Sequence, residues 1–170
     1  AIELFQETIG LDENFGPAYL MLANAYLLLP TYRNAPADEM RQAAIATVEE
    51  GISVDESIRD ASNAIFGFVY HQQMQWLEAE EAYRAATSSE VVDPNAFNWY
   101  SRMLASVGRL DASLEQALRA LEMDPTSAVI NSRVALAYLW LGNTRNAEEF
   151  FERARKFGAS GPTHMMGYAL

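Results

Sequence analysis

Small and apolar residues recur along the chain at steps of three and four, the spacing that places side chains on one face of an α-helix. The clearest case is the segment 110–123, in which Ser113, Ala117 and Ala120 share a face and an Asp-Pro pair follows the last helical residue. The same arrangement returns further along the chain at Ala147, Phe151 and Ala154. Both segments are therefore predicted to be amphipathic helices.

These patterns return at a fixed interval. Gly108 and Gly142 are 34 residues apart, and so are Ala120 and Ala154. A period of this length is typical of stacked helical hairpins, in which each repeat contributes two helices. The sequence predicts a half repeat at each end, 1–15 and 162–170, and four full repeats between them, at 16–59, 60–93, 94–127 and 128–161.

The first full repeat is longer than the others, because Gly16 and the matching Asp60 are 44 residues apart. Most of the excess lies in the segment 30–37, whose two prolines and polar turn residues predict a loop. Asp38 is predicted to cap the helix that follows. This insert is either a functional loop at one edge of the scaffold or an insertion that the fold tolerates.

Several of these residues resemble the tetratricopeptide repeat (TPR). The most specific are the trio already named and the run from Gly108 to Pro125, which opens with Gly-x-Leu-Asp and closes with Ala-Leu-x-Met-Asp-Pro. The resemblance covers essentially the whole chain. It implies an all-α fold, in which residues 1–170 form a single right-handed α-solenoid of TPR helix-turn-helix repeats. Ser101 and Asn131 depart from the residue types usual at their positions in the repeat.

A looser resemblance adds a second expectation. The long first repeat, the Asn98-Trp99-Tyr100 helix and the later Ile-Asn-Ser run also look like TPR regions of bacterial signalling proteins, which carry winged-helix transcription regulators or nucleotide cyclases on the same chain. The chain also begins and ends within expected hairpins, which indicates a fragment of a larger protein. The alternative to a binding module is therefore a regulatory, self-associating segment. Its homodimer would form through exposed apolar residues near the ends, such as Ile2, Phe5, Met165 and Met166.

The composition narrows the function. A formal net charge of −11 repels phosphate backbones and anionic lipids, so neither nucleic acid nor a membrane is an expected partner. Cysteine is absent, which excludes thiolate chemistry and leaves the compartment undecided, with the cytoplasm favoured. His71 and His164 lie in separate repeats and belong to no metal-binding motif. The chain is therefore predicted to have no catalytic residues, no metal and no cofactor.

Charge is sorted between the two helices of each hairpin. Only one acid, Asp60, lies in the four first helices, taken as 16–29, 60–73, 94–107 and 128–141. In a superhelix of hairpins these helices line the concave wall, so the sequence predicts a groove without acids that binds a protein or peptide, such as an acidic or C-terminal segment. Helical spacing places these residues on its wall: Asn24, Phe68, His71, Asn98, Trp99, Arg102, Ser132, Arg133 and Leu136.

Overall fold

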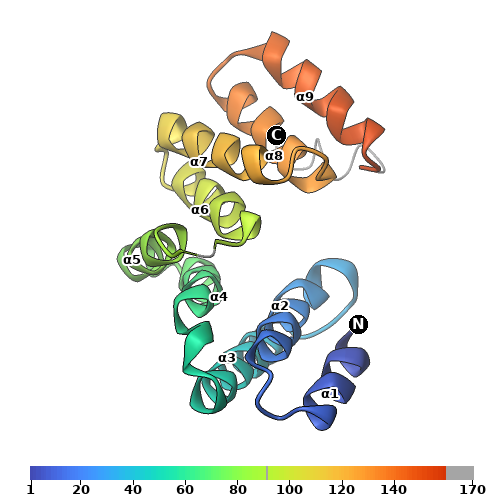
Figure 1. Cartoon of the computed structure of the whole chain (residues 1–170). Helices are drawn as coiled ribbons and strands as arrows, with labels where there is room; N and C mark the ends of the chain where they lie inside the picture. Colours follow the sequence, from blue (N-terminus) through green and yellow to red (C-terminus); the bar gives the residue numbers. More distant parts are fainter. Residues whose placement is uncertain (91, 160–170) are drawn as a thin grey trace. The chain divides into compact units, whose positions relative to one another are not determined.

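A computed structural model describes residues 1–90 and 92–159, and within them the chain consists of helices and turns, with no strand. Figure 1 follows the helices along the chain. They are α1 (Ile2–Leu11), α2 (Gly16–Tyr32), α3 (Ala37–Val54), the 3₁₀ helix η1 (Glu56–Ile58), α4 (Arg59–Gln72), α5 (Trp76–Thr87), α6 (Pro94–Ser106), α7 (Leu110–Met123), α8 (Ala128–Trp140) and α9 (Thr144–Lys156). The prediction of an all-α solenoid of helical hairpins is confirmed. The half repeat expected at 162–170 lies outside the described residues.

The helices form two compact units, Ala1–Val92 and Asp93–Leu170. In the first unit, α2 packs on α3, α4 packs on α5, and α1 lies against α2. In the second unit, α6 packs on α7, α8 packs on α9, and α7 also packs on α8. Of the helices in the described ranges, none combines the length and hydropathy that a membrane span requires. Within each unit, consecutive helices therefore pair as hairpins, as the sequence period predicts.

Small residues allow the two helices of a hairpin to approach closely. A Cβ atom added to Gly67 on α4 would lie 2.8 Å from a ring carbon of Tyr83 on α5, too close for any real side chain. On the second helices, the positions that carry the repeat pattern are buried: Ala44, Val48 and Gly51; Ala79, Tyr83 and Ala86; Ser113, Ala117 and Ala120; Ala147 and Ala154. The small residues that define the period are thus contact points between helices.

The two departures from the TPR pattern are accommodated by hydrogen bonds. Ser101 on α6 is fully buried against Ser113 on α7: the Ser113 hydroxyl donates to the Ser101 carbonyl at 2.8 Å, and the two hydroxyls are 3.0 Å apart. Asn131 on α8 is also fully buried, and its Nδ2 donates to the carbonyl oxygens of Pro125 at 3.1 Å and Ser127 at 2.8 Å. Each polar side chain is therefore used to hold a hairpin or a turn together.

The turn inside a hairpin requires a left-handed backbone. Gly108 and Gly142 both have φ of +77°, a conformation that glycine adopts without a steric penalty. Met74 stands one repeat period before Gly108 and has φ of +59°. The first unit therefore makes the same turn with a residue that is strained in it.

Two local predictions are wrong. The loop expected at 30–37 is shorter, because α2 continues through Pro30 to Tyr32. Proline lacks an N–H and costs one helical hydrogen bond, but only two helical residues follow it, so little of the helix is affected. Asp38 does not cap α3: the N-cap is Pro36, and the Asp38 carboxylate pairs instead with Arg41 one turn later.

Candidate functional site

The nine predicted wall residues are divided between the two units. Asn24 on α2 and Phe68 and His71 on α4 belong to the first unit. The other six belong to the second unit: Asn98, Trp99 and Arg102 on α6, and Ser132, Arg133 and Leu136 on α8.

In the second unit, α6 and α8 are the first helices of consecutive hairpins and they contact each other. Of the six predicted wall residues in this unit, only Arg102, Ser132 and Arg133 are partly accessible. Asn98, Trp99 and Leu136 are buried, with 3%, 7% and 4% of their surfaces exposed. The Ser132 hydroxyl donates to the Ala128 carbonyl at 2.8 Å. Of these three side chains, Arg102 is the charged group that this part of the chain offers to a partner, because the Arg133 Nε is enclosed.

Arg102 differs from the arginines that pair within their own helices. On the second helices, Arg84 pairs with Glu80 at 2.7 Å and Arg119 pairs with Glu115 at 2.9 Å. Arg102 makes no ion pair with any residue in the described ranges, because α6 contains no carboxylate one turn away. The acid that precedes α6, Asp93, accepts a hydrogen bond from the Asn95 backbone N–H at 2.7 Å and caps the helix. The Arg102 guanidinium is thus available to bind an anion.

The distribution of carboxylates follows the helix pairs. Asp60 is the only acid within α2, α4, α6 and α8, whose bounds all lie in the described ranges. The second helices are rich in acids: Asp38, Glu39, Glu49 and Glu50 on α3; Glu78, Glu80 and Glu81 on α5; Asp111, Glu115 and Glu122 on α7; Glu148, Glu149 and Glu152 on α9. An anion that approaches the chain therefore meets less repulsion from the first helices than from the second helices.

In the first unit, the predicted wall residues are largely enclosed. Phe68 and His71 have only 6% and 7% of their surfaces exposed. The His71 ring lies 5.7 Å from the ring of Trp76, with the two planes tilted by 50°. Asn24 is half-buried, and its Oδ1 atom is enclosed without a hydrogen-bond donor among the described residues. His71 is therefore part of the packing between α4 and the start of α5, a contact that the sequence reading missed.

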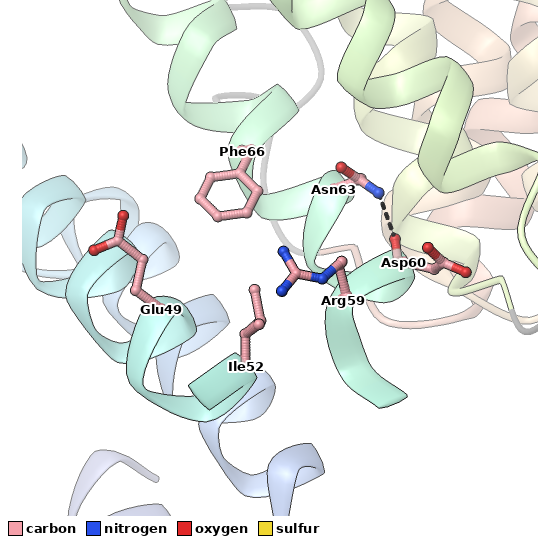
Figure 2. A pocket seen from close by; sticks show the side chains of 6 residues that line it. All are labelled: Glu49, Ile52, Arg59, Asp60, Asn63 and Phe66. Atoms are coloured by element: carbon pink, nitrogen blue, oxygen red, sulfur yellow. Dashed lines mark hydrogen bonds between the residues drawn. The ribbon is translucent and has the colours of Figure 1, made fainter. Parts of the chain in front are cut away.

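The structure also contains a pocket that the sequence did not predict. This junction pocket has a volume of about 400 Å³ and is lined by Glu49, Ile52, Arg59, Asp60, Asn63 and Phe66. Figure 2 shows that it opens between α3 and the first turns of α4. The extra length of the first repeat lies mostly at 30–37, around the turn from α2 to α3, so it gives no signal for a pocket here.

Arg59 is the one basic residue that lines the junction pocket, and it is held by an acid outside the pocket. Its Nε and one terminal nitrogen donate to the two carboxylate oxygens of Glu56, at 2.5 and 2.8 Å. These hydrogen bonds hold the pKa of Glu56 below its usual range and raise the pKa of Arg59. The positive charge in the pocket is thus already matched, whereas Glu49 and Asp60 make no ion pair with the described residues.

Within 1–90 and 92–159, no group of three or more histidine, aspartate or glutamate side chains is placed to hold a metal ion. His164 lies outside the described residues.

Solved structures of helical repeat proteins have a similar fold. A crystal structure of MamA is similar with a TM-score of 0.60 and 18% identity, over 92% of this chain and 85% of that one. PilF of Pseudomonas aeruginosa is similar with a TM-score of 0.69 and 22% identity, over 91% of this chain and 66% of that one. Both are TPR-repeat proteins. This chain has the TPR fold.

The sequence matches no protein-family model, and no curated protein matches it. The TPR hairpins α6/α7 and α8/α9 contain the motif residues on which the resemblance was based, from Gly108 to Ala154. What each hairpin binds must therefore be inferred from its own side chains.

Proposed function

We propose that this TPR chain is a non-catalytic protein-interaction module that binds a segment of a partner protein on its first helices. The TPR fold supports the general role, because stacked hairpins present extended surfaces that are used to bind other chains. The choice of the first helices is supported by their lack of acids, with Asp60 as the single exception.

The proposed ligand is an acidic segment or a free C-terminus. Arg102 on α6 and Arg133 on α8 would bind its carboxylates, since guanidinium groups form two parallel hydrogen bonds with a carboxylate. Buried Trp99 and Leu136 support these two helices from within, and Ser132 lies next to Arg133 in the chain. Asn98 would add an enclosed amide acceptor. Its Oδ1 receives no hydrogen bond from the described residues.

The three wall residues of the first unit are proposed to play a lesser part. Asn24 is the most accessible of them and could hydrogen-bond to the backbone of an extended peptide. Phe68 and His71 would shape the surface from below, because both are buried.

The observation that carries the proposal is the state of Arg102, whose guanidinium has no carboxylate partner in the described chain although the protein has a net charge of −11. Several arginines on the acidic second helices are neutralised by their own helix, as Arg119 is by Glu115, whereas Arg145 and Arg153 on α9 make no ion pair with the described residues. A cation kept free in an acidic protein favours an anionic ligand.

The test is a binding titration with the full chain at low salt. The probes are a fluorescein-labelled peptide of sequence Gly-Ser-Asp-Leu-Asp-Leu with a free C-terminus and the same peptide amidated. The double variant Arg102→Glu with Arg133→Glu should lose binding by at least about tenfold, because two attractive pairs become repulsive. The control variant Arg119→Glu makes the same type of charge change on α7 and should bind as wild type. Unchanged affinity of the double variant would reject the proposal.

A second candidate function is favoured by α1. This helix contains no buried residue, and Leu4 and Leu11 are 63% and 90% exposed. An exposed apolar face of this kind supports the alternative of a self-associating, regulatory segment of a larger bacterial signalling protein. Light scattering over a dilution series separates the two ideas: a dimer that dissociates on dilution and is lost in Leu4→Ser with Leu11→Ser favours self-association, and a monomer at all concentrations rejects it. Met165 and Met166, expected to take part, lie outside the described residues.

A further inference from the structure

The junction between the two hairpins of the first unit is more open than the junction in the second unit. Where α7 packs on α8, Val134 and Asn131 have no exposed surface. Two repeat periods earlier in the sequence, Phe66 and Asn63 occupy the matching positions on α4, and both are only half-buried. They line the junction pocket. The repeat positions that are fully covered where α7 packs on α8 are therefore partly exposed on α4, at the junction with α3.

The helix η1 lies between α3 and α4 at the first junction. It ends at Ile58, which is 4% exposed and packs under two glycines: a Cβ atom at Gly16 would lie 2.6 Å from Ile58 Cγ2, and one at Gly51 would lie 2.9 Å from Ile58 Cδ1. Asp55 fixes the start of η1, because its Oδ1 accepts from the Ser57 N–H at 3.1 Å and from the Ser57 hydroxyl at 2.6 Å. The turn between α3 and α4 is thus tightly packed, and the gap beside it is a built feature of the fold.

The pocket is lined by two apolar side chains and four polar or charged ones. Figure 2 shows Ile52 of α3 and Phe66 of α4 on opposite sides of the gap, with the Arg59 guanidinium extending between them from one end. Glu49 lies at the α3 edge, and Asp60 belongs to the first turn of α4. Because Glu56 neutralises Arg59, the two unpaired carboxylates determine the sign of the local charge. The pocket therefore favours a cation that carries or adjoins an apolar group.

We propose that the junction pocket is a docking site for a basic–apolar segment of a partner protein, in which a leucine or an aromatic side chain packs against Ile52 and Phe66 beside the Arg59 guanidinium. Flanking lysines or arginines bind Glu49 and Asp60. The volume of about 400 Å³ is within the range of about 300–1,000 Å³ that ligand pockets have. The net charge of −11 favours a cationic partner over a second copy of the chain, since two copies repel each other. This site belongs to the first unit, whereas Arg102 and Arg133, here called the arginine surface, belong to the second unit, and it prefers the opposite charge.

The experiment is an NMR titration of the ¹⁵N-labelled full chain with a peptide, capped at both ends, of sequence Gly-Ser-Lys-Leu-Lys-Ser-Gly. The amide signals of Ile52, Asn63 and Phe66 should shift with a Kd on the order of 1 mM or tighter, and the affinity should fall as salt is added. Glu49→Lys should weaken binding by about fivefold to tenfold, because it replaces an attraction by a repulsion. The matched control is Glu122→Lys on α7, an exposed acid whose replacement changes the net charge equally and should have no effect.

Two control peptides test the two halves of the proposal. A Lys-Ser-Lys peptide should bind at least about fivefold more weakly, because it lacks the apolar side chain, and a Glu-Leu-Glu peptide should not shift these signals. Equal affinity for the Lys-Ser-Lys peptide, or shifts that Glu49→Lys leaves unchanged, would overturn the docking site. Shifts that appear with protein concentration alone would show that a second copy is the occupant and would overturn the choice of partner. The Arg102→Glu variant should bind the Lys-Leu-Lys peptide as wild type, so failure here and failure of the arginine surface are distinguishable.

Discussion

Replacing Met74 with glycine should stabilise the protein, although a glycine usually weakens a fold. Met74 has φ of +59°, and a left-handed backbone costs a residue with a side chain roughly 1–2 kcal/mol. Glycine removes that cost but has more conformational entropy to lose, about 0.5–1 kcal/mol. The methionine side chain is 70% exposed, so little packing is lost. The difference leaves a gain of roughly 0.5–1 kcal/mol in the free energy of unfolding.

The reverse change should have the opposite sign. Gly108→Ala places a Cβ on a backbone with φ of +77° and should destabilise by about 1 kcal/mol. Nothing lies within 4 Å of the added Cβ, so the effect isolates backbone strain from steric overlap. Gly10→Ala is the matched control: Gly10 lies within α1 and its Cβ would also meet open space, so alanine should be neutral or stabilising there.

The assay is thermal and urea unfolding of the full chain followed by circular dichroism. For a chain of this length, 1 kcal/mol corresponds to about 2–4 °C in Tm. Hydrogen exchange measured on peptides from the α4–α5 hairpin should slow in Met74→Gly, because the strain is local. If Met74→Gly is no more stable than wild type while Gly108→Ala is clearly destabilised, the two turns are not equivalent and the reasoning from the repeat is refuted.

Three further predictions concern the first unit. Gly67→Ala should cost roughly 1–3 kcal/mol, because its Cβ would lie 2.8 Å from the Tyr83 ring; an unchanged Tm would contradict the close approach of α4 and α5. Pro30→Ala should stabilise α2 by less than the roughly 3 kcal/mol of a mid-helix proline, since it restores one backbone donor close to the helix end, and a drop in Tm would argue against the helical Pro30. The hydrogen bonds from Ser57 lower the pKa of Asp55, so its contribution to stability is present above the unfolded pKa of about 3.9 and is lost as pH falls through the lower folded value. Asp55→Asn should therefore remove part of the acid sensitivity seen in urea unfolding at pH 7 and pH 3, and an identical pH dependence would exclude this role.

The spacing of small residues was enough to predict the helix pairs. Ala79, Tyr83 and Ala86 on α5 are buried because three- and four-residue steps fix one helix face, and the face with the smallest side chains is the one that a neighbouring helix can approach. The same local rules failed at Pro30 and Asp38, where propensity favours a helix end and a cap. There the packing of α2 on α3 outweighs the cost of one missing hydrogen bond.

By itself, the sequence determined the period, the hairpins and the near absence of acids from the first helix of each pair, because helical geometry makes these properties local. It placed Asn98 and Trp99 on the correct helix but did not predict that both side chains are buried. Only the tertiary structure decided which wall residues are accessible, and only it opened the junction pocket beside Phe66. The reason is that exposure depends on how far the neighbouring hairpin covers a face, and that distance is set by non-local packing, such as Ile58 against Gly16, which no spacing along the chain encodes.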